Sequence, residues 1–288
     1  MNADFGKRSY EYAIGCFKAS PRQPLSEDQW TRLRNSDRKT AESLLSEFGF
    51  PAVSGERTPV DSIEQDMAST VAFIRANAPD QELTNLLFFE EDALNLKILI
   101  KAHRMGIDPS SLSLTEGGFP TDILDVCART EDFSLLGKDL ETSLAGVPDV
   151  KSPCELSCVI DKAMYLHSLK EAKKCFSKAF YKLLLEYGIG RNRLTLTRLK
   201  KLGKSPEEYG FALLPVDMPE GLHDDAKSAD VIMSETKKAF DSIVNELSFD
   251  EGMGFIARYY FLKKNDASAL RLLFANNDFA SAGGASNE

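Results

Sequence analysis

The feature that most constrains this 288-residue chain is the segment 88–106, FFEEDALNLKILIKAHRMG, which has helical character but no single apolar face. At about 100° per residue, its large apolar side chains spread around the whole circumference: Leu94, Leu96, Ile98, Leu99, Ile100 and Met105. A helix that is apolar on all sides is normally buried, so other helices are expected to pack around it. Polar and charged residues are interspersed: Asp92, Asn95, Lys97, Lys101 and Arg104. Because buried charge is costly unless it is paired or meets water, these residues are candidates for a special role.

Helix signals recur along the rest of the chain, and strand signals are scarce. Ser152, Pro153 and Glu155 form a helix-start signature, and we expect a long helix from there to Tyr187 that ends at Gly188 and Gly190. Further helices are expected over 192–202, after the Ser205-Pro206-Glu207-Glu208 cap, and over 226–247. The sequence therefore predicts an all-α protein.

Composition places the chain among ordinary globular proteins, with 43% hydrophobic and 27% charged residues. No apolar run approaches the roughly 20 residues that span a bilayer, and the first residues lack the apolar stretch of a secretory signal. We therefore expect a cytoplasmic location. The five cysteines are scattered, as is typical of reduced thiols. Cys154 and Cys158 could share a metal on one helical face, but no second ligand pair accompanies them, so packing is favoured and no metal is expected.

The net charge of −9 is unevenly distributed. Residues 151–204 contain 13 Lys and Arg against 4 Asp and Glu, which leaves a balance of −18 for the rest of the chain. This segment is either a solvated basic helix face or a surface for an acidic partner. Nucleic acid is not expected, because the chain is acidic overall and the basic segment carries no recognisable nucleic-acid-binding motif.

Motifs for nucleotide binding and nucleophilic catalysis are incomplete. Gly203-Lys204-Ser205 resembles the end of a phosphate-binding loop, but Arg198 occupies the position of its first glycine and a helix precedes it instead of a strand. A dinucleotide fingerprint starting at Gly188 fails, since Arg193 replaces its third glycine. The three histidines form no recognisable triad. We therefore expect no catalytic residues, no cofactor and no small-molecule substrate.

One acidic stretch keeps an enzyme alternative open. His223, Asp224, Asp225 and Asp230 resemble the magnesium-binding aspartates of all-α isoprenoid synthases. A second carboxylate motif is missing, because the best candidate, at 265–268, lacks the glutamate that should follow it. Acids in the first turns of a helix are also explained by the helix dipole.

The helix at 92–106 has two weaker copies later in the chain. A shift of 97 residues places Asn95 on Asn192, Lys101 on Arg198 and Gly106 on Gly203, and a shift of 174 places Asp92 on Asp266. The shared form is Asp-x-x-Asn-x-Lys/Arg. The copies are degenerate at three positions: Ile189 and Leu194 in the second copy, and Ala269 in the third. Such internal repetition indicates three related modules.

Taken in order, several motifs resemble one family. These are the Tyr10-Glu-Tyr-Ala helix, Asp92-x-x-Asn95-x-Lys97, Glu155…Asp161-Lys162, Asn192…Arg198-x-Lys200-x-x-Gly203, and Asp266…Arg271. The chain is similar to the C subunit of the archaeal and bacterial V-type (A-type) ATPases, the counterpart of the eukaryotic vacuolar d subunit. The resemblance implies three similar helical modules around a pseudo-threefold axis that together form a funnel.

From the resemblance we expect modules at 1–110, 111–210 and 211–280, a disordered tail at 281–288, and N-terminal helices packed against the last module. The implied function is a non-catalytic rotor socket that links the central stalk to the membrane proteolipid ring and transmits rotation for proton or sodium transport. Its location would be peripheral to the cytoplasmic membrane, through the complex. The alternatives are an all-helical adaptor unrelated to a rotary motor and, less favoured, the magnesium-dependent enzyme.

The candidate site residues come from the three repeated helices. Six basic residues are predicted to contact partners: Lys97, Lys101, Arg104, Arg193, Arg198 and Arg271. Four polar residues form the repeat signature: Asp92, Asn95, Asn192 and Asp266. In a funnel, the stripe formed by Lys97, Lys101 and Arg104 would face a water-filled central cavity or the acidic residues of a neighbouring module. The other interpretation is that Asp92, Asn95 and the lysines fasten adjacent helices together.

Overall fold

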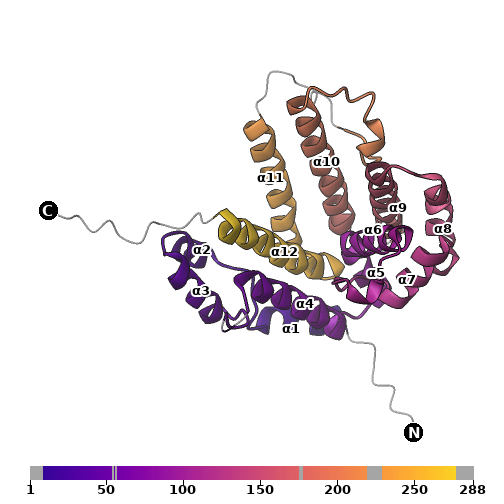
Figure 1. Cartoon of the computed structure of the whole chain (residues 1–288). Helices are drawn as coiled ribbons and strands as arrows, with labels where there is room; N and C mark the ends of the chain where they lie inside the picture. Colours follow the sequence, from indigo (N-terminus) through magenta and orange to yellow (C-terminus); the bar gives the residue numbers. More distant parts are fainter. Residues whose placement is uncertain (1–8, 54, 56, 175–177, 219–228, 277–288) are drawn as a thin grey trace, which may run out of the picture. The chain divides into compact units, whose positions relative to one another are not determined.

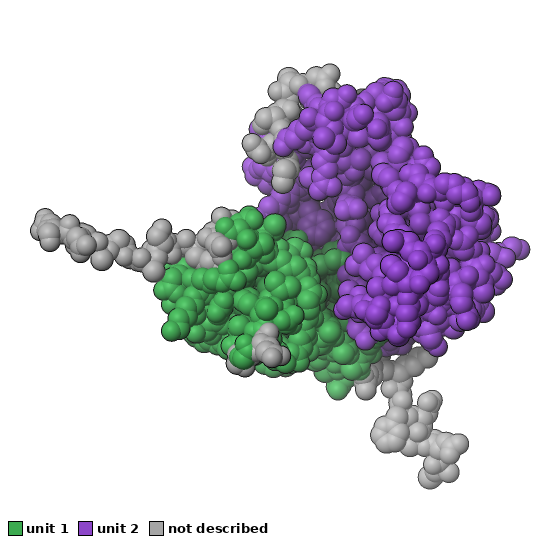
Figure 2. Space-filling model, viewed as in Figure 1, with its two compact units in different colours: residues 1–79, 255–288 green, residues 80–254 purple. Residues whose placement is uncertain are grey.

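A computed structural model of the chain describes residues 9–53, 55, 57–174, 178–218 and 229–276. These residues are 76% helical and include no strand, which confirms the all-α prediction (Figure 1). The fold divides into two compact units (Figure 2). Unit 1 combines residues 1–79 with 255–288, and unit 2 consists of residues 80–254.

Unit 1 is built from helices at both ends of the chain. They are α1 (Tyr10–Ala19), α2 (Glu27–Arg34), α3 (Arg38–Glu47), α4 (Pro59–Asn77) and α12 (Met253–Asn276), which enters the unit at residue 255. Leu33, Leu45, Ile63 and Leu270 each have no exposed surface and bring α2, α3, α4 and α12 into one core. The N-terminal helices thus share a unit with the end of the chain.

Local chemistry sets where the helices of unit 1 begin. Ser26 and Gln29 form a reciprocal capping box at α2, and Thr58 and Asp61 form another at α4. Asp37 accepts the main-chain N–H of Thr40 at the start of α3. Each cap satisfies main-chain donors that the first helical turn leaves without a partner.

Unit 2 is arranged around two long helices. Its elements include α5 (Gln81–Asn85), the 3-10 helix η1 (Leu86–Phe88), α6 (Phe89–Met105), α7 (Thr121–Thr130), the 3-10 helix η3 (Ser134–Leu136), α8 (Lys138–Leu144), α9 (Pro153–Lys174), α10 (Lys178–Lys201) and α11 (Ala229–Glu246). Helix α9 packs against α6, α8 and α10, and α10 packs along α11 (Figure 1). The rings of Phe89, Tyr165 and Tyr187 meet with centroids 5.2–6.1 Å apart, which joins α6, α9 and α10.

The predicted end of the long helix at Gly188 and Gly190 is wrong, because α10 runs through both residues without interruption. The two glycines let neighbouring helices approach instead. A Cβ atom at Gly188 would lie 2.3 Å from the Tyr165 hydroxyl of α9, and one at Gly190 would lie 2.9 Å from Thr236 of α11. Glycine therefore serves tertiary packing at a cost in helix propensity.

We expect Gly188→Ala to destabilise the protein by about 2 kcal/mol, because the new methyl group displaces the Tyr165 hydroxyl. That hydroxyl donates a hydrogen bond to the Leu184 carbonyl at 2.9 Å. Urea denaturation followed by circular dichroism measures the loss. The matched control is Gly15→Ala inside α1, where nothing lies within 4 Å of the added Cβ; it should stabilise by roughly 0.5–1 kcal/mol. Equal stability of Gly188→Ala and wild type would contradict the packing role.

One further expectation about helices is wrong, and it concerns Ser205. Helix α12 passes through Asp266 without a break, so the third repeat copy lies inside a longer helix. No α-helix begins directly after Ser205: the next residues form turns, and the Ser205 hydroxyl is hydrogen-bonded to the side chain and main chain of Glu207. A capping signature alone does not make a helix, because most helical stability comes from packing an apolar face.

The helix of the opening segment is not buried on all sides, contrary to the prediction. In α6, Leu96, Leu99 and Ile100 have no exposed surface, but Leu94 is 44% and Met105 73% exposed. The division into two units does not test the boundaries at 110 and 210, so the three modules stay a prediction. The proposed tail at 281–288 lies outside the described residues.

Candidate functional site

Asn95 connects α6 to a loop that follows it. Its side-chain amide donates to the Thr115 carbonyl at 2.8 Å, and its oxygen accepts the Thr115 main-chain N–H at 3.0 Å. The asparagine has no exposed surface. One buried side chain therefore satisfies both main-chain groups of a residue 20 positions downstream.

Asn192 makes the same pair of contacts from α10. Its amide donates to the Leu214 carbonyl at 2.8 Å, and its oxygen accepts the Leu214 N–H at 2.7 Å, 22 residues downstream. We call this arrangement the asparagine–loop contact. Asn95 and Asn192 were aligned from the sequence as repeat equivalents, and the structure gives them equivalent contacts. The helices they stand on also end alike: Gly106 and Gly203 both adopt positive φ, 68° and 63°.

The two aspartates of the repeat signature, Asp92 and Asp266, also accept hydrogen bonds from main-chain N–H groups. Asp92 is 2% exposed and accepts the N–H of Phe119 at 3.0 Å. The chain approaches Asp92 so closely that a Cβ atom at Gly117 would lie 2.1 Å from its carboxylate. This close approach explains why glycine occupies positions 117 and 118.

In unit 1, Asp266 of α12 plays a related part. It accepts the N–H of Leu25 at 2.7 Å and the indole N–H of Trp30 at 3.2 Å. Burial raises the pKa of Asp266 to about 6, in spite of these two hydrogen bonds and the nearby Lys263, which oppose the shift. The residues that Asp266 binds lie near the start of the chain, whereas Asn95 and Asn192 bind residues that follow them in the sequence.

Lys97, Lys101 and Arg104 all have partners inside unit 2. The Lys97 ammonium lies 2.7 Å from the Asp161 carboxylate of α9, and Lys101 donates to the Ser157 hydroxyl at 3.0 Å. Arg104 lies 2.7 Å from Glu131 and also donates to the carbonyls of Val147 and Val150. These contacts fit the fastening interpretation, and they leave partner binding by the three residues a prediction.

The other three basic residues differ in their surroundings. Arg193 donates a long hydrogen bond of 3.4 Å to Thr236, while its buried Nε atom has no partner among the described residues. Arg271 pairs with Glu64 at 2.7 Å on the surface of unit 1. The side chain of Arg198 is exposed. Arg198 is thus the most available of the six.

A group of charged residues that the sequence did not single out lies beside Lys97. Glu90 accepts a hydrogen bond from the Tyr187 hydroxyl, which joins α6 to α10. Arg191 stands next to them, and the proximity of Tyr187, with Glu90 and Asp161, raises its pKa. With Lys97 and Asp161 these residues line a small cavity of about 70 Å³. Asp161 belongs to a quoted motif, but pairing across three helices leaves no signal in a single sequence.

The described residues bring no three His, Cys, Asp or Glu side chains together as metal ligands. Cys154 and Cys158 lie on α9, and burial, with the neighbouring Cys154, raises the pKa of Cys158 to about 11. Such a thiol stays protonated and unreactive at neutral pH. The stretch His223–Asp225 and the side chain of Asp230 lie outside the described residues.

Comparison with known proteins adds no assignment: no protein-family model and no curated protein matches the chain. Among the helices of the described residues, none combines the length and the hydropathy needed to cross a membrane.

Proposed function

We propose that this chain is the central-rotor socket of a V-type (A-type) ATPase, linking the central stalk to the proteolipid ring without catalysing a reaction itself. The observation that carries the proposal is the asparagine–loop contact, which recurs at Asn95 and Asn192 with the same four atoms and nearly the same spacing. A chance alignment of two helices gives no reason for matching tertiary contacts. Internal repetition is what the resemblance to the rotor-socket family implies.

Asp266 supports a third copy. In a closed threefold arrangement the last module would pack against the first, so a partner for Asp266 in the first module fits the proposal. Leu25 and Trp30, which Asp266 holds, come from that N-terminal region. The grouping of residues 1–79 with 255–288 in one unit agrees with such a closure.

Within this proposal the basic residues divide by their surroundings. Lys97 and Lys101 stiffen α6 against α9, a property that a part transmitting torque requires. Arg198 is free to meet an acidic partner, and Arg193 and Arg271 are weaker candidates for the same role. The proton or sodium specificity belongs to other components of the complex.

The experiment that tests the proposal is purification of the tagged chain from solubilised membranes of its host, with all partners identified by mass spectrometry. Stalk and proteolipid components of a V-type ATPase should co-purify in constant ratio, and deletion of the chain should abolish ATP-driven ion transport. An untagged strain is the control. Recovery of an unrelated protein as the stable partner would favour the adaptor alternative instead.

We expect Arg198→Gln to weaken assembly with the purified stalk about tenfold without changing thermal stability, because an exposed charge affects association more than folding. Lys97→Gln with Lys101→Gln should give the opposite result, lower stability with nearly normal assembly. Arg57→Gln, an exposed change outside the repeated helices, is the charge-matched control. If the double variant keeps its stability and loses assembly, Lys97 and Lys101 contact the partner.

A further inference from the structure

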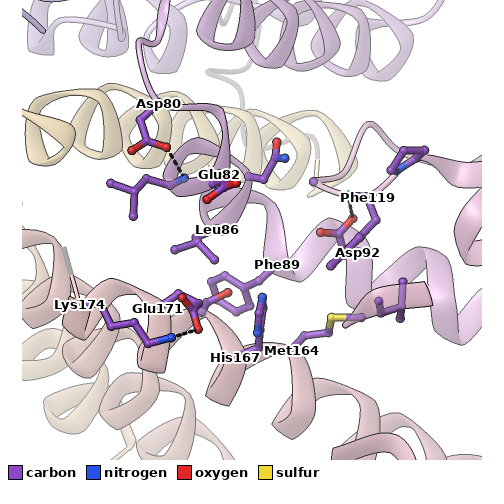
Figure 3. Close-up of a pocket in the computed structure, with 16 residues that line it drawn as sticks. Asp80, Glu82, Leu86, Phe89, Asp92, Phe119, Met164, His167, Glu171 and Lys174 are labelled. Atoms are coloured by element: carbon purple, nitrogen blue, oxygen red, sulfur yellow. Dashed lines mark hydrogen bonds and ion pairs between the residues drawn. The ribbon is translucent and has the colours of Figure 1, made fainter. Parts of the chain in front are cut away.

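Unit 2 contains a partly open hollow of about 750 Å³ beside the first turn of α6 (Figure 3). Its walls come from α5, η1, the chain around Phe119 and the C-terminal half of α9. This volume falls within the range of roughly 300–1,000 Å³ that is usual for small-molecule sites. Of the repeat-signature residues, Asp92 alone is among those that line the hollow. The proposed rotor function therefore gives no reason for the hollow.

The base of the hollow is apolar. Leu86, Phe89, Leu136 and Met164 line it, and each is at most 7% exposed in the protein as a whole. An apolar base of this kind favours a ligand that brings an aromatic or aliphatic body out of water. A ligand that is polar throughout, such as a polyamine or a sugar, would leave this surface without a matching group.

Carboxylates dominate the charged part of the lining. Asp80 and Glu82 come from the start of α5, and Glu171 comes from α9; Figure 3 shows Glu82 and Glu171 on opposite sides of Leu86 in this view. Lys174 is the one Lys or Arg among the described lining residues, and its ammonium lies 2.5 Å from Glu171 on a side chain that is 70% exposed.

His167 also lines the hollow. Its Nδ1 atom faces Asp139 at 3.5 Å, so a further carboxylate stands behind the ring. Asp139 also binds Lys170 at 2.5 Å. The hollow is therefore a site of negative potential, which attracts cations and repels carboxylates and phosphates.

We propose that the hollow binds a small organic cation: an amine whose apolar body packs on Leu86, Phe89 and Met164, with its ammonium group between Glu82 and Glu171. The apolar base disfavours ligands that are polar throughout, and the acidic walls disfavour anions. An amine with an apolar body fits both parts of the hollow. This site is independent of the rotor proposal, since it requires no partner protein.

The test uses three probes that share a phenyl body and differ in charge: phenethylamine, 2-phenylethanol and phenylacetate. Each is titrated into the full-length protein whose methionine methyl groups are labelled with ¹³C. Phenethylamine should bind about tenfold more tightly than phenylacetate at low salt, and less so as salt screens the carboxylates. The Met164 methyl resonance, assigned through Met164→Leu, should shift on addition of the amine.

Paired variants identify the charges responsible. Glu82→Gln with Glu171→Gln should weaken amine binding about fivefold and leave 2-phenylethanol unchanged, because both variants keep the shape of the walls. Glu141→Gln on α8, outside the hollow, should bind the amine like wild type. Absence of amine binding, equal affinity for amine and phenylacetate, a Met164 resonance that does not move, or a charge preference that survives the double change would each overturn the proposal.

Discussion

Replacing Lys263 by methionine is expected to lower the free energy of unfolding of unit 1 by about 3–5 kcal/mol, because it leaves a buried carboxylate without its cation. The Lys263 ammonium of α12 lies 2.6 Å from the carboxylate of Asp66 on α4, and both side chains are 3% exposed. It also lies over the ring of Phe50, 4.9 Å from its centroid. The measurement is urea denaturation followed by the fluorescence of Trp30, the one tryptophan of the sequence.

Arg271→Met is the matched control for this prediction. Arg271 and Glu64 join the same two helices at 2.7 Å, but their side chains are 38% and 49% exposed. An exposed pair of this kind contributes at most about 1 kcal/mol, so the control should unfold close to wild type. The double variant Lys263→Met with Asp66→Asn should recover at least half of the loss, since it removes both buried charges.

A small effect of Lys263→Met, similar to that of the control, would contradict this account. So would a double variant no more stable than the single one, because the cost would then come from lost packing and not from the unpaired carboxylate.

Several helix starts of this fold were predictable because their causes are local. Ser26, Asp37 and Ser152 stand directly before the helices that they cap, and each accepts a main-chain N–H three residues later. Gly106 ends α6 in the left-handed conformation, which glycine adopts without strain. Short-range chemistry of this kind is fully contained in a few consecutive residues.

The helix that continues through Gly188 could not be predicted by the same reasoning. Glycine is less favourable than alanine inside a helix by about 1 kcal/mol, and the feature that accounts for glycine here is Tyr165, more than twenty residues earlier. A single sequence does not state which residues meet across helices. Tertiary packing therefore overrides local propensity at this position.

In the candidate site, too, some features were predictable from the sequence and others were not. Asn95 and Asn192 were identified from sequence because they recur at the same point of a repeated helix, but their partners, Thr115 and Leu214, lie in loops with no shared pattern. Lys97 was expected to face a partner protein, yet its ammonium binds Asp161. Charge on an apolar helix indicates that a counterion exists; it does not say whether that counterion belongs to the same chain.

Asp266 gives the second large effect, a dependence of stability on pH. The residue is 8% exposed, and burial is the largest cause that raises its pKa from 3.8 to about 6. The groups that face it are Lys263 on α12, Asp66 on α4, and the N–H donors of Leu25 and Trp30. The folded protein therefore binds a proton at this site between pH 4 and 6, where the unfolded chain has already released it.

Because protonation favours the folded state, the contribution of Asp266 is fully present below about pH 4 and is lost as the pH rises through about 6. A shift of this size corresponds to about 3 kcal/mol. The difference in unfolding free energy between wild type and Asp266→Asn, measured through Trp30 in urea from pH 4 to pH 8, should fall by that amount and level off above about pH 7, since asparagine does not titrate. Groups elsewhere in the chain cancel in this difference.

Asp66→Asn serves as the comparison, because it alters the same buried cluster while leaving Asp266 free to titrate. Parallel curves for wild type and Asp266→Asn, or a gap that grows in favour of wild type with rising pH, would show that Asp266 is already ionised in the folded protein at pH 4.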